Sequence, residues 1–386
     1  MKQIAVINAG SSTLKLSLFD GCGAKRLSVL ADRLGGSTPF VSIRDASGAS
    51  CFDDVITADG HHGALAWLFD WFAAERPDIR LTAVGHRVVH GGDVLTESAL
   101  VTPAICEQIR ALVPLAPLHQ GHNVHAIEFI AARFPDLPQV ACFDTAFHAT
   151  QGRMERMFAL PRRYMEQGIH RYGFHGLSYE HIANRLQSMG AALADGRSIV
   201  CHLGNGASLC AMQDGRSVAT TMAFTALEGL PMGTRCGSID PGVLLYLLEH
   251  DKLSVHELSD LLYNQSGLLG ISGVSADMRD LLADNTPAAA EAVEYFCYRI
   301  AREIGSLSAA LGGLDTLVFT GGIGEHAQWV RARVCAWSRW LGVEIDQSAN
   351  TRHAEVLNTW SSAVRVLIIA ADEESVIAGH TVRMVS

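Results

Sequence analysis

Residues 4–21 read IAVINAGSSTLKLSLFDG, and this stretch decides the fold. An apolar strand, residues 4–7, runs into a polar turn at residues 8–13 and continues as a strand in which leucines alternate with polar residues. The turn gathers small hydroxyls, an amide and Gly10, and Lys15 follows it. Backbone N–H groups at such a turn can face an anion, and the glycine permits a close approach. On its own, an ordinary hairpin with a polar turn explains the stretch equally well.

The same pattern recurs half a chain later, in residues 198–215, which read SIVCHLGNGASLCAMQDG. Aligned without gaps, Gly10 meets Gly204 and the Asp-Gly pair at residues 20–21 meets the one at residues 214–215. Two similar hairpins indicate a duplicated domain with one phosphate-binding turn in each half. Two such turns around a nucleotide are what a phosphoryl-transfer enzyme requires.

The composition indicates a globular protein with roughly two or three domains in its 386 residues. No apolar run reaches the ~20 residues that span a bilayer, and no signal-peptide pattern opens the chain. The nine cysteines form no CxxC pair, so we expect reduced thiols and a cytoplasmic location. The net charge of −10 argues against nucleic-acid and anionic-membrane partners, so a few placed cations must attract any anionic ligand.

Strands alternate with helices along the chain, which indicates the α/β class. The patterns predict helices at residues 64–75, 103–112, 124–134, 179–189, 243–250, 254–263, 288–311 and 373–384. Besides the two hairpins, they predict strands at residues 81–89, 139–143, 317–320 and 364–370. Residues 24–59 are compatible with further strands. A domain boundary is expected near residue 147, where an irregular stretch begins. The Gly/Thr-rich residues 220–242 are too long for a plain connection and are expected to be functional.

Four polar or Gly-rich turns each follow an apolar strand: residues 8–13, 202–206, the region of Gly233, and residues 321–324. In α/β folds, ligands bind at the carboxyl ends of strands, where these turns lie. The chain has no GxxxxGK[ST] motif, and residues 321–324 do not fit GxGxxG. A P-loop kinase and a dinucleotide-binding fold are therefore not supported.

Two arginines stand in unusual settings. Arg87 ends an apolar strand within GHRVVHGG, and Arg235 lies among small residues in PMGTRCG. The arginine fork matches carboxylate and phosphate oxygens two at a time. Each could alone form a structural ion pair, but together, in an acidic chain, they are expected to clamp an anionic ligand.

Asp144 and two histidines are further candidates. Asp144 ends a strand in CFDTAFH, where a carboxylate can bind Mg²⁺ or orient a nucleophile. His175 in RYGFHG and His202 in HLGNG are singled out from the seventeen histidines only by their motifs. No set of residues has the spacing of a zinc site. The remaining pairs are expected at the surface: His61, His62, His122 and His125.

Ten motifs follow one another along the chain: NAGSSTLK, GHRVVHGG, LAPLH, FDTAFH, RYGFHGLS, HLGNGASL, GTRCGSIDPG, GVSADMRD, FTGGIGE and a late EE. In this order they resemble the acetate and propionate kinases over essentially the whole chain. That resemblance implies membership of the actin-like ATPase superfamily, with two duplicated actin-like (ribonuclease H-like) α/β domains around a nucleotide cleft. It further implies a homodimer and a need for Mg²⁺, with Mn²⁺ as an alternative. The implied domains are residues 1–146 completed by residues 371–386, and residues 147–370, which hold most of the nucleotide site.

The resemblance also assigns roles to individual residues. The implied catalytic group, which holds the acyl phosphate and stabilises the transferring phosphoryl group, is Arg87, Asp144, His175 and Arg235. The implied metal site is Asn8 and Glu373. The implied ATP-binding residues are Ser11, Thr13, Lys15, His202, Leu203, Gly204, Asn205, Gly206, Asp277, Met278, Arg279, Gly322, Ile323, Gly324, Glu325 and His326. The implied acyl pocket is Arg87, Val89, Leu118, Phe174 and Ala226.

The expected reaction is reversible phosphoryl transfer from ATP to acetate, giving acetyl phosphate and ADP. A carboxylate acceptor, with a pKa near ~4.3, is already ionised at pH 7, so Asp144 is expected to organise a metal, its waters or an arginine instead of abstracting a proton. At Ala226 the family normally has proline, and the smaller side chain could admit the extra methylene of propionate. Propionate kinase and a non-kinase, actin-like regulatory protein that binds nucleotide are the alternatives.

Overall fold

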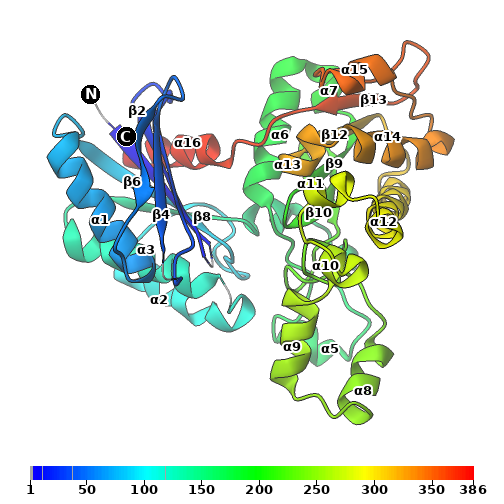
Figure 1. Cartoon of the computed structure of the whole chain (residues 1–386), viewed down its shortest axis with the longest axis horizontal. Helices are drawn as coiled ribbons and strands as arrows, with labels where there is room; N and C mark the ends of the chain where they lie inside the picture. Colours follow the sequence, from blue (N-terminus) through cyan, green and yellow to red (C-terminus); the bar gives the residue numbers. More distant parts are fainter. Residues whose placement is uncertain (1–2, 11, 37, 118) are drawn as a thin grey trace. The chain divides into compact units, whose positions relative to one another are not determined.

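The computed structural model describes residues 3–10, 12–36, 38–117 and 119–386. The chain forms two compact units, of which the first comprises the chain up to Phe147 together with Asp372–Ser386, and the second comprises His148–Ala371. The boundaries expected from the sequence fall one residue earlier in each case. Because the chain returns to the first unit at its end, α16 (Glu373–Val385) belongs to the same unit as the opening hairpin (Figure 1).

The described part of the first unit holds one mixed sheet with the strand order β5-β4-β3-β2-β1-β6-β8-β7. β1 pairs antiparallel with β2 and parallel with β6, which pairs parallel with β8. The strands are β1 (Gln3–Ala9), β2 (Leu14–Asp20), β3 (Lys25–Asp32), β4 (Phe40–Asp45), β5 (Ser50–Val55), β6 (Leu81–Val88), β7 (Ala99–Leu100) and β8 (Gln139–Phe143).

Helices cover this sheet with apolar side chains. α1 (Gly60–Glu75) and α3 (Gln120–Arg133) share a core with β1, β2 and β3, because the alternating leucines of the opening hairpin face these helices. α2 (Pro103–Ala111) packs against α3, and α16 packs across β1, β6 and β8. Gly85 of β6 permits this last contact, since a Cβ there would lie 2.4 Å from Thr381 Oγ1 and 2.6 Å from Ile377 Cγ2.

The second unit repeats the central strand arrangement of the first. Its sheet has the order β11-β10-β9-β12-β13, with β9 antiparallel to β10 and parallel to β12, which is parallel to β13. This matches β3-β2-β1-β6-β8 in order and direction, so the predicted α/β duplication is confirmed. The strands are β9 (Arg197–Leu203), β10 (Ala207–Gln213), β11 (Arg216–Thr220), β12 (Thr316–Thr320) and β13 (Arg365–Ile368).

The long helix α12 (Pro287–Leu311) packs against β9, β10 and β11. Thr286 caps its start and Gly312 ends it in the left-handed conformation. The other helices of this unit are α4 (Arg153–Arg156), α5 (Arg162–Glu166), α6 (Gly176–Met189), α7 (Ala191–Ala194), α8 (Pro241–Glu249), α9 (Val255–Asn264), α10 (Gly267–Ser272), α11 (Met278–Ala283), α13 (Gly321–His326), α14 (Gln328–Trp337) and α15 (Gln347–Thr351). Three short 3-10 helices complete the described chain: η1 (Val113–Leu115), η2 (Ala146–Thr150) and η3 (Arg339–Leu341).

Two details correct the sequence-based picture. The second hairpin turn is one residue shorter than the first, because Ala9 pairs with Leu14 whereas Leu203 pairs with Ala207. The ungapped alignment therefore holds only up to the turns. The expected turn at residues 321–324 is instead the start of α13, which follows β12 directly. Gly321 permits this with φ +77°, since a Cβ there would lie 2.7 Å from the Leu203 carbonyl oxygen.

Between β11 and α8, the expected functional stretch contains no helix or strand from residue 221 to residue 240, all of which the structure describes. Across the described ranges, no helix is long and apolar enough to cross a membrane.

Candidate active site

In the first unit, an arginine and a carboxylate meet at the carboxyl edge of the sheet. Arg87 lies near the end of β6, and Asp144 directly follows the neighbouring parallel strand β8. Arg87 Nε donates to both Asp144 carboxylate oxygens at 3.0 and 3.1 Å, and Nη2 donates to Oδ2 at 2.6 Å. The Asp144 side chain is 1% exposed and that of Arg87 is 21% exposed. Asp144 was expected to organise a metal, its waters or an arginine, and the structure shows it paired with Arg87.

Two further acceptor oxygens lie near the same guanidinium. Asn8, on β1, places Oδ1 3.4 Å from Arg87 Nη1, and Glu373, the first residue of α16, places Oε2 3.8 Å from Arg87 Nε. Burial alone lowers the pKa of Arg87, but the charges of Asp144 and Glu373 outweigh burial and raise that pKa above the usual arginine value. Arg87 therefore stays cationic in this site.

The oxygens around Arg87 suit a hard cation. An amide oxygen from Asn8 and carboxylates from Asp144 and Glu373 are ligands of the kind that Mg²⁺ prefers, and Mg²⁺ usually takes only one or two protein carboxylates. Among the described residues, no group of three or more His, Cys, Asp or Glu side chains forms a metal cage. The residues implied for the metal, Asn8 and Glu373, thus have fitting donor chemistry.

The first turn is closed by its own backbone. Gly10 N–H donates to the Thr13 carbonyl oxygen at 2.8 Å. Lys15 is exposed near the start of β2 and pairs with Asn8 across the hairpin. Its side chain therefore extends from the same end of the hairpin as Asn8, one of the two residues implied for the metal. Ser11, the third residue predicted for the phosphates, lies outside the described residues.

In the second unit, two imidazoles stack beside the second turn. The His175 and His202 rings lie 4.4 Å apart with 28° between their planes. His175 Nδ1 is hydrogen bonded to Ser208 Oγ at 2.8 Å, and His202 Nδ1 to Ser178 Oγ at 2.8 Å. His175 itself adopts a left-handed conformation (φ 58°) directly before α6, so the chain holds this ring in a defined direction.

Arg235 and His175 both approach Gly206 of this turn. A Cβ on Gly206 would lie 3.4 Å from His175 Nε2 and 3.8 Å from Arg235 Nη1. Arg235 is held from behind, because its Nη1 donates to the Ala226 carbonyl oxygen at 3.0 Å. The structure thus brings His175, Arg235 and the turn at residues 204–206 together within one unit.

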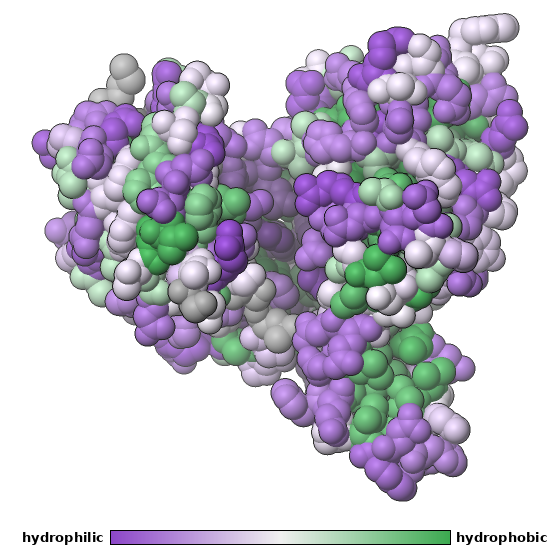
Figure 2. Space-filling view, in the orientation of Figure 1, coloured by the Kyte–Doolittle hydropathy of each residue, from purple (hydrophilic) through white to green (hydrophobic). Residues whose placement is uncertain are grey.

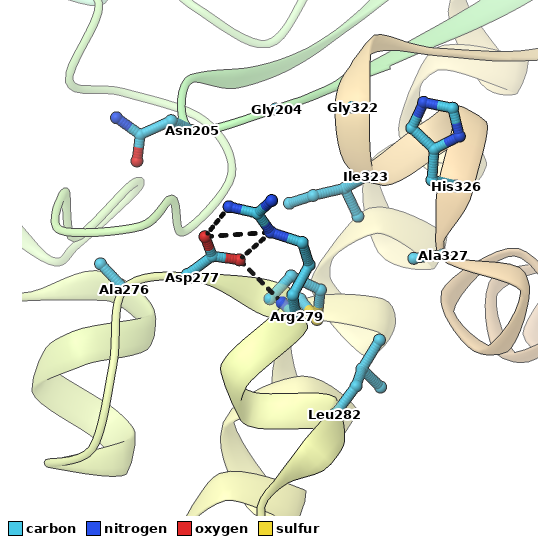
Figure 3. A pocket seen from close by; sticks show the side chains of 11 residues that line it. Gly204, Asn205, Ala276, Asp277, Arg279, Leu282, Gly322, Ile323, His326 and Ala327 are labelled. Carbon is cyan, nitrogen blue, oxygen red and sulfur yellow. Dashed lines mark hydrogen bonds and ion pairs between the residues drawn. The ribbon is translucent and has the colours of Figure 1, made fainter. Parts of the chain in front are cut away.

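A cavity of about 560 Å³ opens next to this turn (Figure 3). Its volume is within the range of small-molecule sites, roughly 300–1,000 Å³. Eight residues predicted for the nucleotide line it: Gly204, Asn205, Asp277, Met278, Arg279, Gly322, Ile323 and His326. Sequence reasoning missed Ala276, Leu282 and Ala327, of which Leu282 follows from helical spacing because it lies one turn after Met278 on α11.

An ion pair borders the cavity, drawn with dashed lines in Figure 3. Arg279 Nη2 donates to Asp277 Oδ2 at 2.6 Å, and the Arg279 backbone N–H donates to Asp277 Oδ1 at 2.8 Å. The hydrogen bonds from Arg279 hold the pKa of Asp277 below its usual value. Because 89% of the Arg279 side chain is exposed, its guanidinium can move without breaking core contacts.

Five other predicted nucleotide residues of the second unit do not line this cavity. His202 and Leu203 belong to β9, and Gly206 lies beside His175. Gly324 is buried on α13, where its carbonyl oxygen accepts from Arg331 Nη1 at 2.9 Å. Glu325 Oε1 accepts from the Gly321 N–H at 2.9 Å and from the Ala371 N–H at 3.0 Å, so this carboxylate fixes the start of α13.

The residues predicted for the acyl pocket come from both units. In the first, Val89 is half-buried and its N–H donates to Asn123 Oδ1 at 3.1 Å. In the second, Phe174 is buried and its carbonyl oxygen is hydrogen bonded to His148 Nε2 at 2.9 Å; burial lowers the pKa of His148 to about 4. Ala226 is half-buried, and Leu118 lies outside the described residues. The pocket as a whole stays a prediction.

The expectation that four histidines lie at the surface is wrong for two of them. His62 and His125 are exposed, but His61 and His122 are half-buried and their rings lie 4.4 Å apart. His61 Nε2 is 2.7 Å from the Gly10 carbonyl oxygen. The neighbouring helices α1 and α3 bring these side chains to the first turn, a contact that the sequence does not reveal.

Comparison with known proteins gives one consistent family. Residues 3–379 match the model of the Acetokinase family. An acetate kinase of Rhodopseudomonas palustris is 51% identical over 389 residues, which cover 99% of this chain and 98% of that protein. Among solved structures, a propionate kinase from Francisella tularensis matches with a TM-score of 0.93 and 35% identity over 99% of both chains. The acetate kinase of Porphyromonas gingivalis matches with a TM-score of 0.90 and 32% identity over 100% of both chains.

Proposed function

The chain belongs to the acetokinase family, and from this premise we propose that it transfers the terminal phosphoryl group of ATP reversibly to acetate, giving acetyl phosphate and ADP. The family and the duplicated actin-like fold that the motifs imply are confirmed. The roles of the individual site residues are proposals.

One observation carries the proposed chemistry: His175 Nε2 and Arg235 Nη1 both approach Gly206, whose turn borders the cavity proposed for the nucleotide. A phosphoryl group in transfer spreads negative charge over its equatorial oxygens. Donors that are already fixed around that charge lower the barrier without reorganising during the reaction. Ser208 and the Ala226 carbonyl oxygen fix His175 and Arg235 in this way.

In the first unit, Arg87 is proposed to hold the carboxylate or the acyl phosphate, because a guanidinium can pair two oxygens at once. Asp144 is proposed to keep the Arg87 fork in one orientation, since its two oxygens occupy the Nε and Nη2 side of that fork. The acceptor carboxylate needs no general base because it is ionised at neutral pH. Asp144 therefore contributes by positioning Arg87.

The family implies Mg²⁺, with Mn²⁺ as an alternative, and we assign its protein ligands to Asn8 and Glu373. Their oxygens converge around Arg87 within the first unit. When bound, the ion would neutralise charge on the ATP phosphates. Asn8 and Glu373 themselves would hold and orient the ion, and Asp144, engaged by Arg87, would remain outside the first ligand set.

Acetate is the proposed main substrate, and propionate a secondary one. The family normally has proline where this chain has Ala226, and a methylene in such a pocket is worth about 1–3 kcal/mol of discrimination. The Ala226 carbonyl oxygen still binds Arg235, so the smaller side chain leaves the arginine contact in place. We expect propionate to be used with more than a hundredth of the efficiency of acetate, and Ala226→Pro to lower that ratio.

The test is an ATP-dependent acyl-hydroxamate assay with Mg²⁺, comparing acetate, propionate and butyrate at equal concentrations. Acyl phosphate should form with acetate and be lost in Arg87→Ala and Arg235→Ala. Arg76→Ala, which removes a surface arginine paired with Asp78, is the matched control and should remain active. ATP binding without acyl phosphate from any acid would support the alternative, a non-kinase regulatory protein.

A homodimer is proposed through α8. Its sequence PGVLLYLLE is apolar, yet none of its residues is buried, and Leu245 and Tyr246 are 61% and 56% exposed. Figure 2 shows apolar side chains gathered in this part of the second unit, where Figure 1 places α8 and α9. A second copy of the chain would remove this surface from water, as obligate dimers do.

Sedimentation equilibrium tests the dimer. Leu245→Asp should give monomers, whereas Trp360→Asp, at a residue 98% exposed outside α8, should leave the dimer intact. A monomeric wild-type protein would refute the dimer, and a dimeric Leu245→Asp variant would place the interface elsewhere.

A cytoplasmic location is also proposed, supported by nine cysteines of which none forms a disulfide.

A further inference from the structure

Two consecutive carbonyl groups at the end of β1 are held by side chains from two helices. The Ala9 carbonyl oxygen accepts from Asn123 Nδ2, on α3, at 3.0 Å. The Gly10 carbonyl oxygen accepts from His61 Nε2, on α1, at 2.7 Å. These carbonyls lie where β1 leaves the sheet and the phosphate turn begins. Neither contact belongs to the regular hydrogen bonding of a strand or helix.

The contact to Gly10 identifies which ring nitrogen of His61 is the donor. A carbonyl oxygen can only accept, so His61 Nε2 carries a proton and donates it. The His122 ring packs against the His61 ring, with 4.4 Å between the ring centroids and 31° between the ring planes. His122 directly precedes Asn123 on α3, so the same turn of that helix supports both contacts.

Asn123 also reaches a second strand end. While its Nδ2 donates to Ala9, its Oδ1 accepts from the Val89 N–H at 3.1 Å. The side chain is 2% exposed, so water does not compete for these hydrogen bonds. One buried amide therefore links the turn after β1 to the residue that follows β6, two positions after Arg87.

We propose that His61, His122 and Asn123 form a clamp that positions the phosphate turn of this enzyme. The clamp touches no reacting atom itself. Instead, it sets the direction in which the chain leaves β1 toward Thr13 and Lys15, and it ties that direction to β6 through Val89. This inference rests on the proposed function, because it assumes that the turn binds the phosphates of ATP.

The clamp predicts different kinetic effects for the loss of the His61 contact and for the loss of the Asn123 contacts. His61→Phe keeps an aromatic ring against His122 but removes the donor to Gly10. It should raise the KM for ATP about tenfold and leave the KM for acetate within about twofold, because the lost hydrogen bond goes to the phosphate turn and not to the residues around Val89. His61→Gln, which restores an N–H donor, should recover part of the loss. Asn123→Ala should raise both KM values, because Asn123 also holds Val89.

The experiment is steady-state kinetics of the 386-residue protein and its variants, with thermal unfolding measured for each variant. His125→Phe is the matched control, since His125 is an exposed histidine on α3, the helix that carries His122 and Asn123, and it should behave as wild type. The clamp is refuted if His61→Phe keeps the wild-type KM for ATP, or if it lowers kcat alone with both KM values unchanged, as a purely structural residue would. An inactive wild-type protein would refute the proposed function instead.

Discussion

Replacing Asp144 by asparagine tests the ion pair with Arg87 most directly, because the exchange keeps the size of the side chain and removes its charge. The Asp144 carboxylate is 1% exposed and accepts three hydrogen bonds from Arg87. An amide keeps one acceptor oxygen but turns an NH₂ group toward a guanidinium that itself only donates. One of the close contacts in the site thus becomes a donor facing a donor.

The expected magnitudes follow from this geometry. Removing one partner of a buried ion pair costs about 3–5 kcal/mol. Here Glu373 lies 3.8 Å from Arg87 Nε and keeps a negative charge nearby, and 21% of Arg87 is exposed. We therefore expect a loss of ~3 kcal/mol of stability, at the lower end of that range. An arginine displaced by about 1 Å should lower kcat about 100-fold.

The acyl-hydroxamate assay measures kcat, and chemical unfolding of the same samples measures stability. Asp78→Asn is the matched control, because it removes a carboxylate from an Arg–Asp pair whose aspartate is 61% exposed, and it should leave stability nearly unchanged. A kcat of Asp144→Asn within threefold of wild type, with the fold intact, would show that Asp144 does not position Arg87.

Three further outcomes are expected. Burial lowers the pKa of His86 and His148 from 6.5 to about 4, so the unfolded chain binds more protons and stability should fall as pH drops from about 6.5 to 4. Urea unfolding of His148→Gln should show a smaller loss of stability over this pH range. An unchanged dependence of stability on pH would exclude this histidine as a cause. Arg279→Ala should raise the KM for ATP severalfold with the KM for acetate unchanged, since Arg279 borders the nucleotide cavity; equal effects on both constants in steady-state kinetics would contradict this placement. Glu325→Ala leaves the Gly321 and Ala371 N–H groups without their acceptor, so the midpoint of thermal unfolding should fall; a wild-type midpoint would show that α13 does not depend on this carboxylate.

The repeated hairpin made the fold predictable from the sequence. Alternating leucines predict the face of β2 that joins the core with α1 and α3, although the other face is buried as well except at Lys15. The Asp-Gly pairs mark where each hairpin ends, so the two halves can be aligned without a structure. The alignment fails at the turns, because a turn that is one residue shorter leaves the flanking apolar pattern unchanged. The start of α13 was missed for a related reason: four residues with three glycines favour a turn locally, whereas the helix start is held by tertiary contacts of Gly321 with Leu203 and with the Glu325 carboxylate.

The candidate site was predictable where side chains pair with side chains. Arg87 and Asp144 could be singled out as charged residues at strand ends, and Asp277 and Arg279 through the motif that resembles the family, although their pairing with each other was not predicted. The cavity members Ala276 and Ala327 could not, because alanine carries no chemical signal and enters the site only through the position of its backbone.

Contacts between side chains and the main chain explain the rest of what the sequence could not show. His61 binds the Gly10 carbonyl and Arg235 binds the Ala226 carbonyl, and every residue of the chain offers such a group. A main-chain partner therefore leaves no complementary residue type to find in the sequence. The choice of partner is made by the packing of α1 and α3 on the sheet, which is why His61 and His122 looked like surface residues until that packing was known. The same reasoning applies to any exchange at Gly10 or Ala226: its effect on the site depends on whether the new residue keeps the carbonyl in place, more than on the side chain that it adds.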